Sequence, residues 1–137
     1  MATLCDTGPL VALLNVRDAD HERCGVALQA LSTDELVTTW PCLAEAMYLL
    51  GRWGGIRAQN ALWIYIDDGL VSLHSPAGGE GHRMWILMND YADSPMDLAD
   101  ASLVAAAETL NLRRVFTLDR HFHAYRQRVG EAFEVVP

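Results

Sequence analysis

Acidic side chains in four distant segments of the sequence have types and spacing that suit shared chemistry. They are Asp6, Glu45, Asp100 and Asp119, with Asp97 as a fifth candidate. Carboxylates that lie close together repel one another, and some would stay protonated unless a divalent cation neutralised them. Oxygen ligands favour Mg²⁺ or Mn²⁺ over zinc. Such a site can bind the metal, place a water molecule in line with a phosphorus atom and neutralise charge on a phosphate.

Three of these acids also have a purely structural interpretation, which the sequence alone leaves open. Asp6 and Asp119 each end a predicted strand and precede a possible helix, and Asp is a good N-cap residue. Glu45 is the only charge in the apolar run Cys42–Leu50. It is therefore either a buried, paired carboxylate or a first-turn residue that favours the helix dipole.

Asp97 and Asp100 share one face of the helix predicted after Pro95, because they are three residues apart. Ser94-Pro-Met-Asp97 has the form of a capping box, with Ser94 as the N-cap and Asp97 at N3. Asp100 is not expected to take part in that cap, since it lies where the helix turns to its apolar face. Asp100 is therefore the better candidate for a functional carboxylate.

The rest of the chain must position these acids, and its pattern predicts a single domain over residues 1–137. Strands are predicted at Ala2–Asp6, Leu36–Thr38, Leu70–His74, Arg114–Leu118 and Phe133–Val136. Helices are predicted at Leu10–Val16, Asp20–Leu31, Pro41–Trp53, Ile56–Asp68, Gly81–Tyr91, Pro95–Leu110 and His121–Arg128. This alternation is typical of a mostly parallel sheet with helices on both faces. Sites in such sheets lie at the carboxyl ends of the strands, so Asp6 and Asp119 should meet at one edge.

The composition favours a globular protein and excludes several classes. The 137 residues are 51% hydrophobic and 20% charged, which suits one folded domain. No apolar run is long enough to cross a bilayer, and the N-terminus has no pattern of a secretory signal. The three cysteines are odd in number and form no C-x-x-C pair. A reducing, cytoplasmic location is therefore expected.

The charge balance argues against a protein that coats nucleic acid but leaves room for an enzyme that cuts it. The net charge is −8, whereas a coating protein needs a basic surface to displace counterions. All the basic residues are arginine, and half lie in the last quarter of the chain: Arg113, Arg114, Arg120, Arg126 and Arg128. Arginine suits bidentate phosphate contacts, although codon bias in a GC-rich genome would give the same composition.

Four segments, in their order and separation, resemble the PIN domain, as in toxin ribonucleases of the VapC type. The segments are Leu4–Leu13, Cys42–Ala46, Met96–Glu108 and Val115–Phe122. The block around Asp100, followed by Thr-Leu-Asp119-Arg-His-Phe122, is the most specific part. The resemblance covers essentially the whole chain and implies a three-layer α/β/α sandwich with a mostly parallel central sheet.

The resemblance also implies an activity and a set of site residues. It implies an acidic pocket that binds Mg²⁺, or Mn²⁺, and hydrolyses RNA phosphodiesters through a metal-activated water. Four positions match the acidic quartet of the family: Asp6, Glu45, Asp100 and Asp119. Asp97 matches an extra acid of some members, and Thr7 and Thr117 match hydroxyl positions that would orient the carboxylates. Family members commonly dimerise and dock an antitoxin, so a homodimer and an antitoxin partner are expected.

Two other functions stay open on the sequence. Asp6 is placed to form an aspartyl phosphate as the nucleophile of a phosphoryl-transfer enzyme. Haloacid-dehalogenase-like phosphatases carry a second Asp two residues later, however, where this chain has Gly8. The alternative is a non-catalytic binding module in which the acids only cap helices.

A few other residues have weaker interpretations. His121 and His123 would point in different directions on a helix, so joint metal ligation is disfavoured. A surface or RNA-facing role stays open for them, and the commoner expectation is that they have no special role. Trp63, Tyr65 and Ile66 are apolar enough to suggest a partner surface.

Overall fold

Five short strands form one sheet, and every neighbouring pair in it is parallel. The structure is a computed structural model that describes residues 1–137. The sheet order is β3-β2-β1-β4-β5. The strands are β1 (Ala2–Cys5), β2 (Glu35–Thr39), β3 (Val71–His74), β4 (Arg114–Phe116) and β5 (Glu134–Val136). All five predicted strands are present, each within two residues of its predicted ends.

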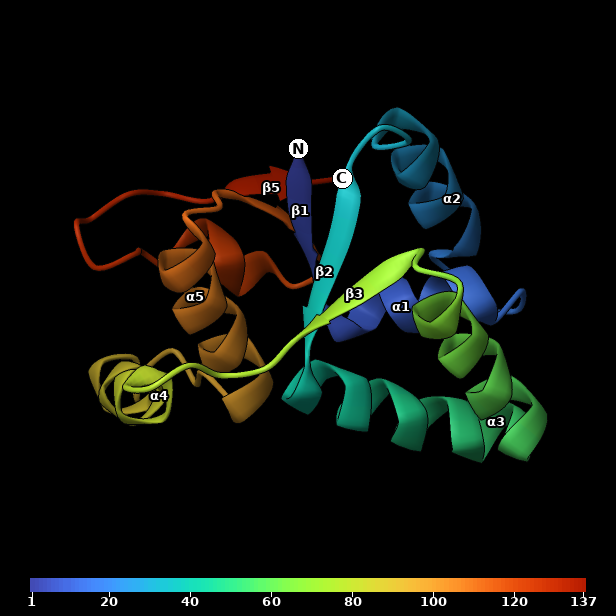
Figure 1. Ribbon diagram of the computed structural model, residues 1–137, viewed down its shortest axis with the longest axis horizontal. Helices are drawn as coiled ribbons and strands as arrows, with labels where there is room; N and C mark the ends of the chain where they lie inside the picture. Colours follow the sequence, from blue (N-terminus) through green and yellow to red (C-terminus); the bar gives the residue numbers. More distant parts are fainter.

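Helices cover both faces of this sheet, which confirms the predicted α/β sandwich (Figure 1). The helices are α1 (Thr7–Leu14), α2 (His21–Ala30), α3 (Trp40–Asp67), α4 (Glu80–Asp90) and α5 (Leu98–Leu110), with a 3₁₀ turn at Arg120–His123. In Figure 1, α4 and α5 lie on one side of the sheet, and α1, α2 and α3 lie on the other. None of the helices is long and apolar enough to cross a membrane.

The central strands β1, β2 and β4 are buried except at their first residues, because both of their faces are covered. Successive residues of β1 point to opposite faces, so Leu4 packs in the core beside α5 and Cys5 packs in the core beside α1 and α3. Val115 and Phe116 of β4 divide between the same two cores. These two cores fix β1 and β4 side by side, and the loops that follow both strands emerge at the same edge.

Helix α5 is buried along most of its length. Every residue from 99 to 107 is buried, and five of these are alanine, whose small side chain allows close packing. A helix that is apolar nearly all round belongs in the interior. Its first turn therefore carries Asp100 into the protein rather than into solvent.

Several predicted helix boundaries are wrong. Helix α1 begins at Thr7 rather than Leu10, because Pro9 fits in a first turn, where its missing N–H has no intrahelical partner. Helix α5 begins at Leu98 rather than Pro95. The helix predicted at 121–128 is only the 3₁₀ turn Arg120–His123.

The helices predicted at 41–53 and 56–68 form one bent element, α3. The bend lies at Gly55, whose backbone has φ 63° and ψ −153°. This conformation is essentially restricted to glycine, because a Cβ atom would clash with the backbone. Gly55 therefore sets the angle between the half of α3 that begins below the sheet edge and the half that returns to β3.

We predict opposite effects on the free energy of unfolding when alanine replaces Gly55, at the bend of α3, and Gly25, within α2. Gly55→Ala should lower the free energy of unfolding by about 1–3 kcal/mol, because alanine must adopt a glycine-only conformation. Gly25→Ala in α2 should raise it by about 0.5–1 kcal/mol, since Gly25 has ordinary helical geometry and open space where a Cβ would lie. Urea unfolding measures both, and a neutral Gly55→Ala would contradict the bend.

Candidate active site

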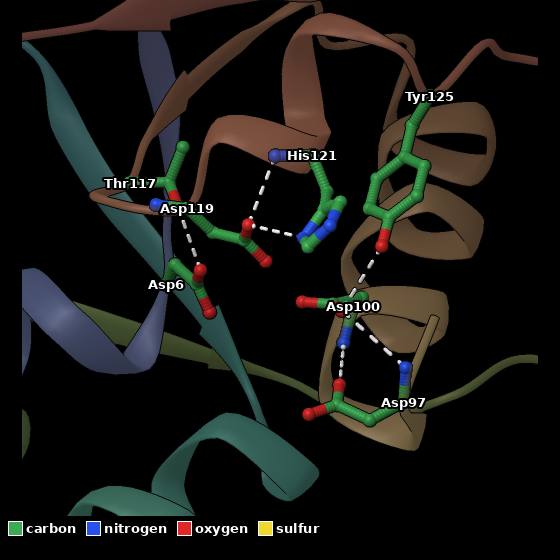
Figure 2. A network of polar contacts seen from close by, with 7 residues as sticks. All are labelled: Asp6, Asp97, Asp100, Thr117, Asp119, His121 and Tyr125. Atoms are coloured by element: carbon green, nitrogen blue, oxygen red, sulfur yellow. Dashed lines mark hydrogen bonds and ion pairs between the residues drawn. The ribbon is translucent and has the colours of Figure 1, made fainter. Parts of the chain in front are cut away.

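Three carboxyl groups meet at the carboxyl edge of the sheet. Strands β1 and β4 are paired with Cys5 opposite Phe116, and the Asp6 N–H donates to the Phe116 carbonyl at 2.9 Å. Asp6 and Asp119 follow these two strands, and Asp100 reaches the same place from the first turn of α5 (Figure 2). One oxygen from each of Asp6, Asp100 and Asp119 lies within 4.8 Å of the others. The predicted meeting of Asp6 and Asp119 at one edge is therefore seen.

Asp6 is buried and held by donors from three elements. Its Oδ1 accepts from the Thr7 N–H at 2.8 Å, and its Oδ2 accepts from the Thr117 hydroxyl at 2.7 Å. The Cys42 thiol lies 3.7 Å from Oδ1. Burial raises the pKa of Asp6, the bonds from Thr117 and Thr7 oppose that rise, and the charges of Asp119 and Glu45 add to it.

Asp100 combines a capping role with a strongly perturbed pKa. Its Oδ2 accepts from the Asp97 N–H and from the Tyr125 hydroxyl, both at 3.3 Å, while its own N–H donates to Asp97 Oδ1 at 2.8 Å. Burial, followed by the charges of Asp97, Asp6 and Asp119, raises the pKa of Asp100 to about 8. The metal-free cluster therefore keeps a proton at neutral pH rather than ionising all its carboxyls.

Asp119 caps the 3₁₀ turn and is linked to Asp6 through a threonine. Its Oδ1 accepts from the His121 N–H at 2.9 Å and faces His121 Nδ1 at 2.8 Å. The Thr117 hydroxyl accepts from the Asp119 N–H at 2.9 Å and donates to Asp6. A single hydroxyl thus fixes the relative position of two of the three acids.

The other predicted site residues take different places. Glu45 is exposed on α3 and lies outside the group of three, although its charge is near enough to raise the pKa of Asp6. Asp97 is exposed at the N-cap of α5. The Thr7 hydroxyl donates to the Cys42 carbonyl at 3.3 Å, so Thr7 contacts a carboxylate only through its backbone.

The predicted capping box is wrong by three residues. Asp97, not Ser94, is the N-cap of α5, and Asp100 is its N3 partner. Met96, directly before the N-cap, is buried in the same core as Ala101, which lies four residues after the N-cap, as in a hydrophobic staple. Anchoring Met96 in the core fixes where the helix begins, and Asp100 therefore has both a structural and a site role.

Three site neighbours are absent from the predicted set: Cys42, His121 and Tyr125. The sequence places His121 on a longer helix, 121–128, on which it would point in a different direction from His123, whereas the structure has only the 3₁₀ turn. The contact between His121 and Asp119 could have been predicted from the Asp-x-His spacing. The N-cap residue of a short turn accepts hydrogen bonds from the residue two positions later. Tyr125 has no comparable signal, since its contact with Asp100 depends on tertiary packing.

Capping alone does not account for the arrangement. Asp6 and Asp119 each cap a helix, as their structural interpretation predicts, and Asp97 caps α5 in place of Ser94. Caps can be spread anywhere on a fold, however, and nothing about capping gathers three repelling carboxyls. Hard oxygen donors at this separation suit a divalent cation such as Mg²⁺ or Mn²⁺.

Comparison with known proteins identifies the family. A model of the PIN domain matches residues 3–127. The chain belongs to the PIN domain family. Ribonuclease VapC26 of Mycobacterium tuberculosis (strain ATCC 25618 / H37Rv) is 30% identical over 135 residues, which are 98% of this chain and 99% of that protein. The resemblance to a VapC-type PIN domain is thereby confirmed.

Solved structures of VapC and VapBC proteins share the fold. The crystal structure of Mycobacterium tuberculosis VapC20, described as a toxin that cleaves the sarcin-ricin loop, superposes with a TM-score of 0.84 at 22% identity, over 99% of this chain and 100% of that chain. VapBC2 from Rickettsia felis, bound to a fragment of promoter DNA, has a TM-score of 0.72 at 14% identity, with both chains fully covered.

We predict that removing the charge of Asp100 stabilises the metal-free protein in a pH-dependent way. A carboxyl whose pKa is raised by folding contributes stability below its ordinary value of 3.8, and this is lost as the pH rises toward about 8. Asp100→Asn keeps the hydrogen-bond acceptor without the charge. In chelator, the free energy of unfolding of Asp100→Asn, measured with urea, should exceed that of the wild type by an amount that grows as the pH rises between these two values. The difference should reach on the order of a few kcal/mol.

The control for this comparison is Asp93→Asn, which removes an exposed carboxylate away from the cluster. Its difference from the wild type should stay small and constant over the same pH range. A constant difference for Asp100→Asn would contradict the raised pKa.

Proposed function

We propose that this PIN domain protein is a metal-dependent endoribonuclease that hydrolyses RNA phosphodiester bonds, and that it is the toxin of a toxin–antitoxin pair. The observation that carries the proposal is the group of three carboxyls from β1, α5 and β4, within 4.8 Å of one another. The relative named Ribonuclease VapC26 and the toxin VapC20 support the reaction class.

Asp6, Asp100 and Asp119 would hold Mg²⁺, with Mn²⁺ as the alternative. When bound, such a cation lowers the pKa of its water and neutralises charge on a phosphate oxygen. Asp100 Oδ1 and Asp119 Oδ2 accept no hydrogen bond from the protein, and both point into the space between the carboxyls in Figure 2. These free oxygens are the natural ligand atoms, and the bonded oxygens keep each carboxylate in place.

Glu45 and Asp97 have supporting roles in this proposal. Glu45 adds negative charge beside Asp6 from the exposed side of α3, so it acts from the rim of the site. Asp97 holds the backbone N–H of Asp100 and thereby orients the first turn of α5. The negative charges of both carboxylates would attract a divalent cation, with the phosphate that it binds, toward the site.

The RNA would be held by a small number of arginines. Arg113 and Arg114 pair with acids, and Arg126 donates to backbone carbonyls. Arg120 and Arg128 are exposed and make no ion pair. Arg120 directly follows Asp119, so we propose it as the contact for an RNA phosphate next to the site.

The proposed partners are an antitoxin protein and a second copy of the chain, in the cytoplasm. The VapBC2 structure from Rickettsia felis, described above, supports an antitoxin. Helix α3 presents exposed Trp53, Ile56, Trp63 and Ile64, an apolar surface that suits a protein partner. Tyr65 and Ile66, suggested from the sequence for this surface, are only partly exposed and pack against the core.

We predict that the purified protein cleaves labelled RNA in the presence of Mg²⁺ and that chelator abolishes cleavage. Asp6→Asn should reduce the rate by about a hundredfold or more, because stabilisation of transition-state charge by a metal is worth several kcal/mol. Glu45→Gln should have a smaller effect, roughly tenfold, since an exposed charge is screened by water and salt.

Glu22→Gln is the matched control, because Glu22 is exposed on α2 and makes no ion pair. It should cleave as the wild type does. Equal cleavage with Mg²⁺, with chelator and by Asp6→Asn would overturn the proposal. Phosphate trapped covalently on Asp6 would instead support an aspartyl-phosphate enzyme.

A further inference from the structure

The 3₁₀ turn and the second residue after it place two aromatic rings against the proposed metal ligands. The His121 ring lies beside Asp119, and the Tyr125 hydroxyl lies beside Asp100 (Figure 2). The two rings are stacked on each other, with centroids 6.2 Å apart and planes inclined by 21°. The two carboxyls are therefore contacted, from outside the cluster, by a single pair of side chains.

We propose that His121 and Tyr125 are positioning residues that orient Asp119 and Asp100 for the metal. This inference rests on the proposed function, since it concerns the same cluster. Neither ring is needed as a metal ligand, because each acts through a carboxylate that it contacts. The pair would set how tightly a divalent cation binds and would leave the chemistry to the acids.

The geometry at Asp119 supports a donor role for His121. A carboxylate oxygen accepts, so the Nδ1 that faces it at 2.8 Å must carry the proton. The backbone N–H of His121 donates to the same Oδ1 at 2.9 Å. Two donors on Oδ1 fix the plane of the carboxylate and direct Oδ2 into the cluster.

The geometry at Asp100 supports the same role for Tyr125. The Tyr125 ring is fully buried, and it meets Tyr91 and Phe122 edge-on at 5.1 Å, which fixes its position. Its hydroxyl donates to Asp100 Oδ2 and leaves Oδ1 free. His121 is about half exposed, so its ring gains its orientation from Asp119 and from the stack on Tyr125.

His123 provides a matched control. It lies two residues beyond His121 in the same 3₁₀ turn and is exposed, and its side chain makes no hydrogen bond or ion pair. A leucine at either position removes one exposed imidazole from the same turn. Only the His121 variant loses a donor to a carboxylate of the cluster.

The test is the affinity of the full chain for Mn²⁺, measured by calorimetric titration at one pH. His121→Leu should bind Mn²⁺ roughly tenfold more weakly, at the low end of the range for residues that orient ligands, because the backbone donor remains. His121→Asn should recover most of this loss, since the Asn amide reaches the position of Nδ1–H. Tyr125→Phe keeps the ring and should also weaken binding, whereas His123→Leu should match the wild type.

Two further readouts separate positioning from other roles. In chelator, His121→Leu should unfold at the same temperature as the wild type, because an exposed ring contributes little to the fold. Excess Mn²⁺ should restore RNA cleavage by His121→Leu to the wild-type rate. A persistent loss at saturating Mn²⁺ would show that His121 contacts the substrate and would overturn the assignment.

The titration also distinguishes failure of this inference from failure of the proposed function. Wild-type protein that binds no Mn²⁺ would overturn both. Wild-type protein that binds Mn²⁺ with the same affinity as His121→Leu would overturn only the role of His121. His121→Asn no better than His121→Leu would overturn the donor role of His121, and unchanged binding by Tyr125→Phe would overturn the role of Tyr125.

Discussion

Electrostatic repulsion among three carboxyls is the constraint on which the site depends. Asp6, Asp100 and Asp119 are brought within 4.8 Å of one another by elements that are distant in the sequence. Without a cation the cluster stays partly protonated, and the pKa of Asp100 rises to about 8. The fold accepts this unfavourable arrangement because the surrounding cores are large and apolar, whereas the acids contribute few contacts. Such stored repulsion is what a divalent cation relieves when it binds.

The parallel sheet makes the cluster possible. Pairing of β1 with β4 puts the residues that follow them at one edge, and the buried helix α5 brings a third acid to the same place. Each acid is then held by at least one donor from another residue: Thr117 for Asp6, Tyr125 for Asp100 and His121 for Asp119. Donors that occupy one oxygen of Asp100 and of Asp119 leave the other oxygen free, so orientation and ligand capacity come from the same contacts.

The fold and the centre of the site follow from the sequence, because they rest on patterns that local physics decides. The alternation of strands and helices predicts the sheet, and the end-of-strand rule places Asp6 beside Asp119. Asp100 is identified because an acid at the start of an apolar helix face must lie at a boundary of the core. Features that depend on tertiary packing are missed or misplaced: the start of α5, which Met96 fixes, and the contact of Tyr125 with Asp100. Glu45 lies in an apolar run of α3, but only one side of this helix packs against the rest of the protein. The side that carries Glu45 is exposed to solvent.

The most direct test of the shared cation site is a crystal of the protein soaked in Mn²⁺ and measured for anomalous scattering. The account predicts anomalous density between the carboxylates of Asp6, Asp100 and Asp119, with oxygen atoms of all three bonded to the ion. Crystals that show the three side chains separated, or manganese bound only elsewhere on the surface, would contradict it.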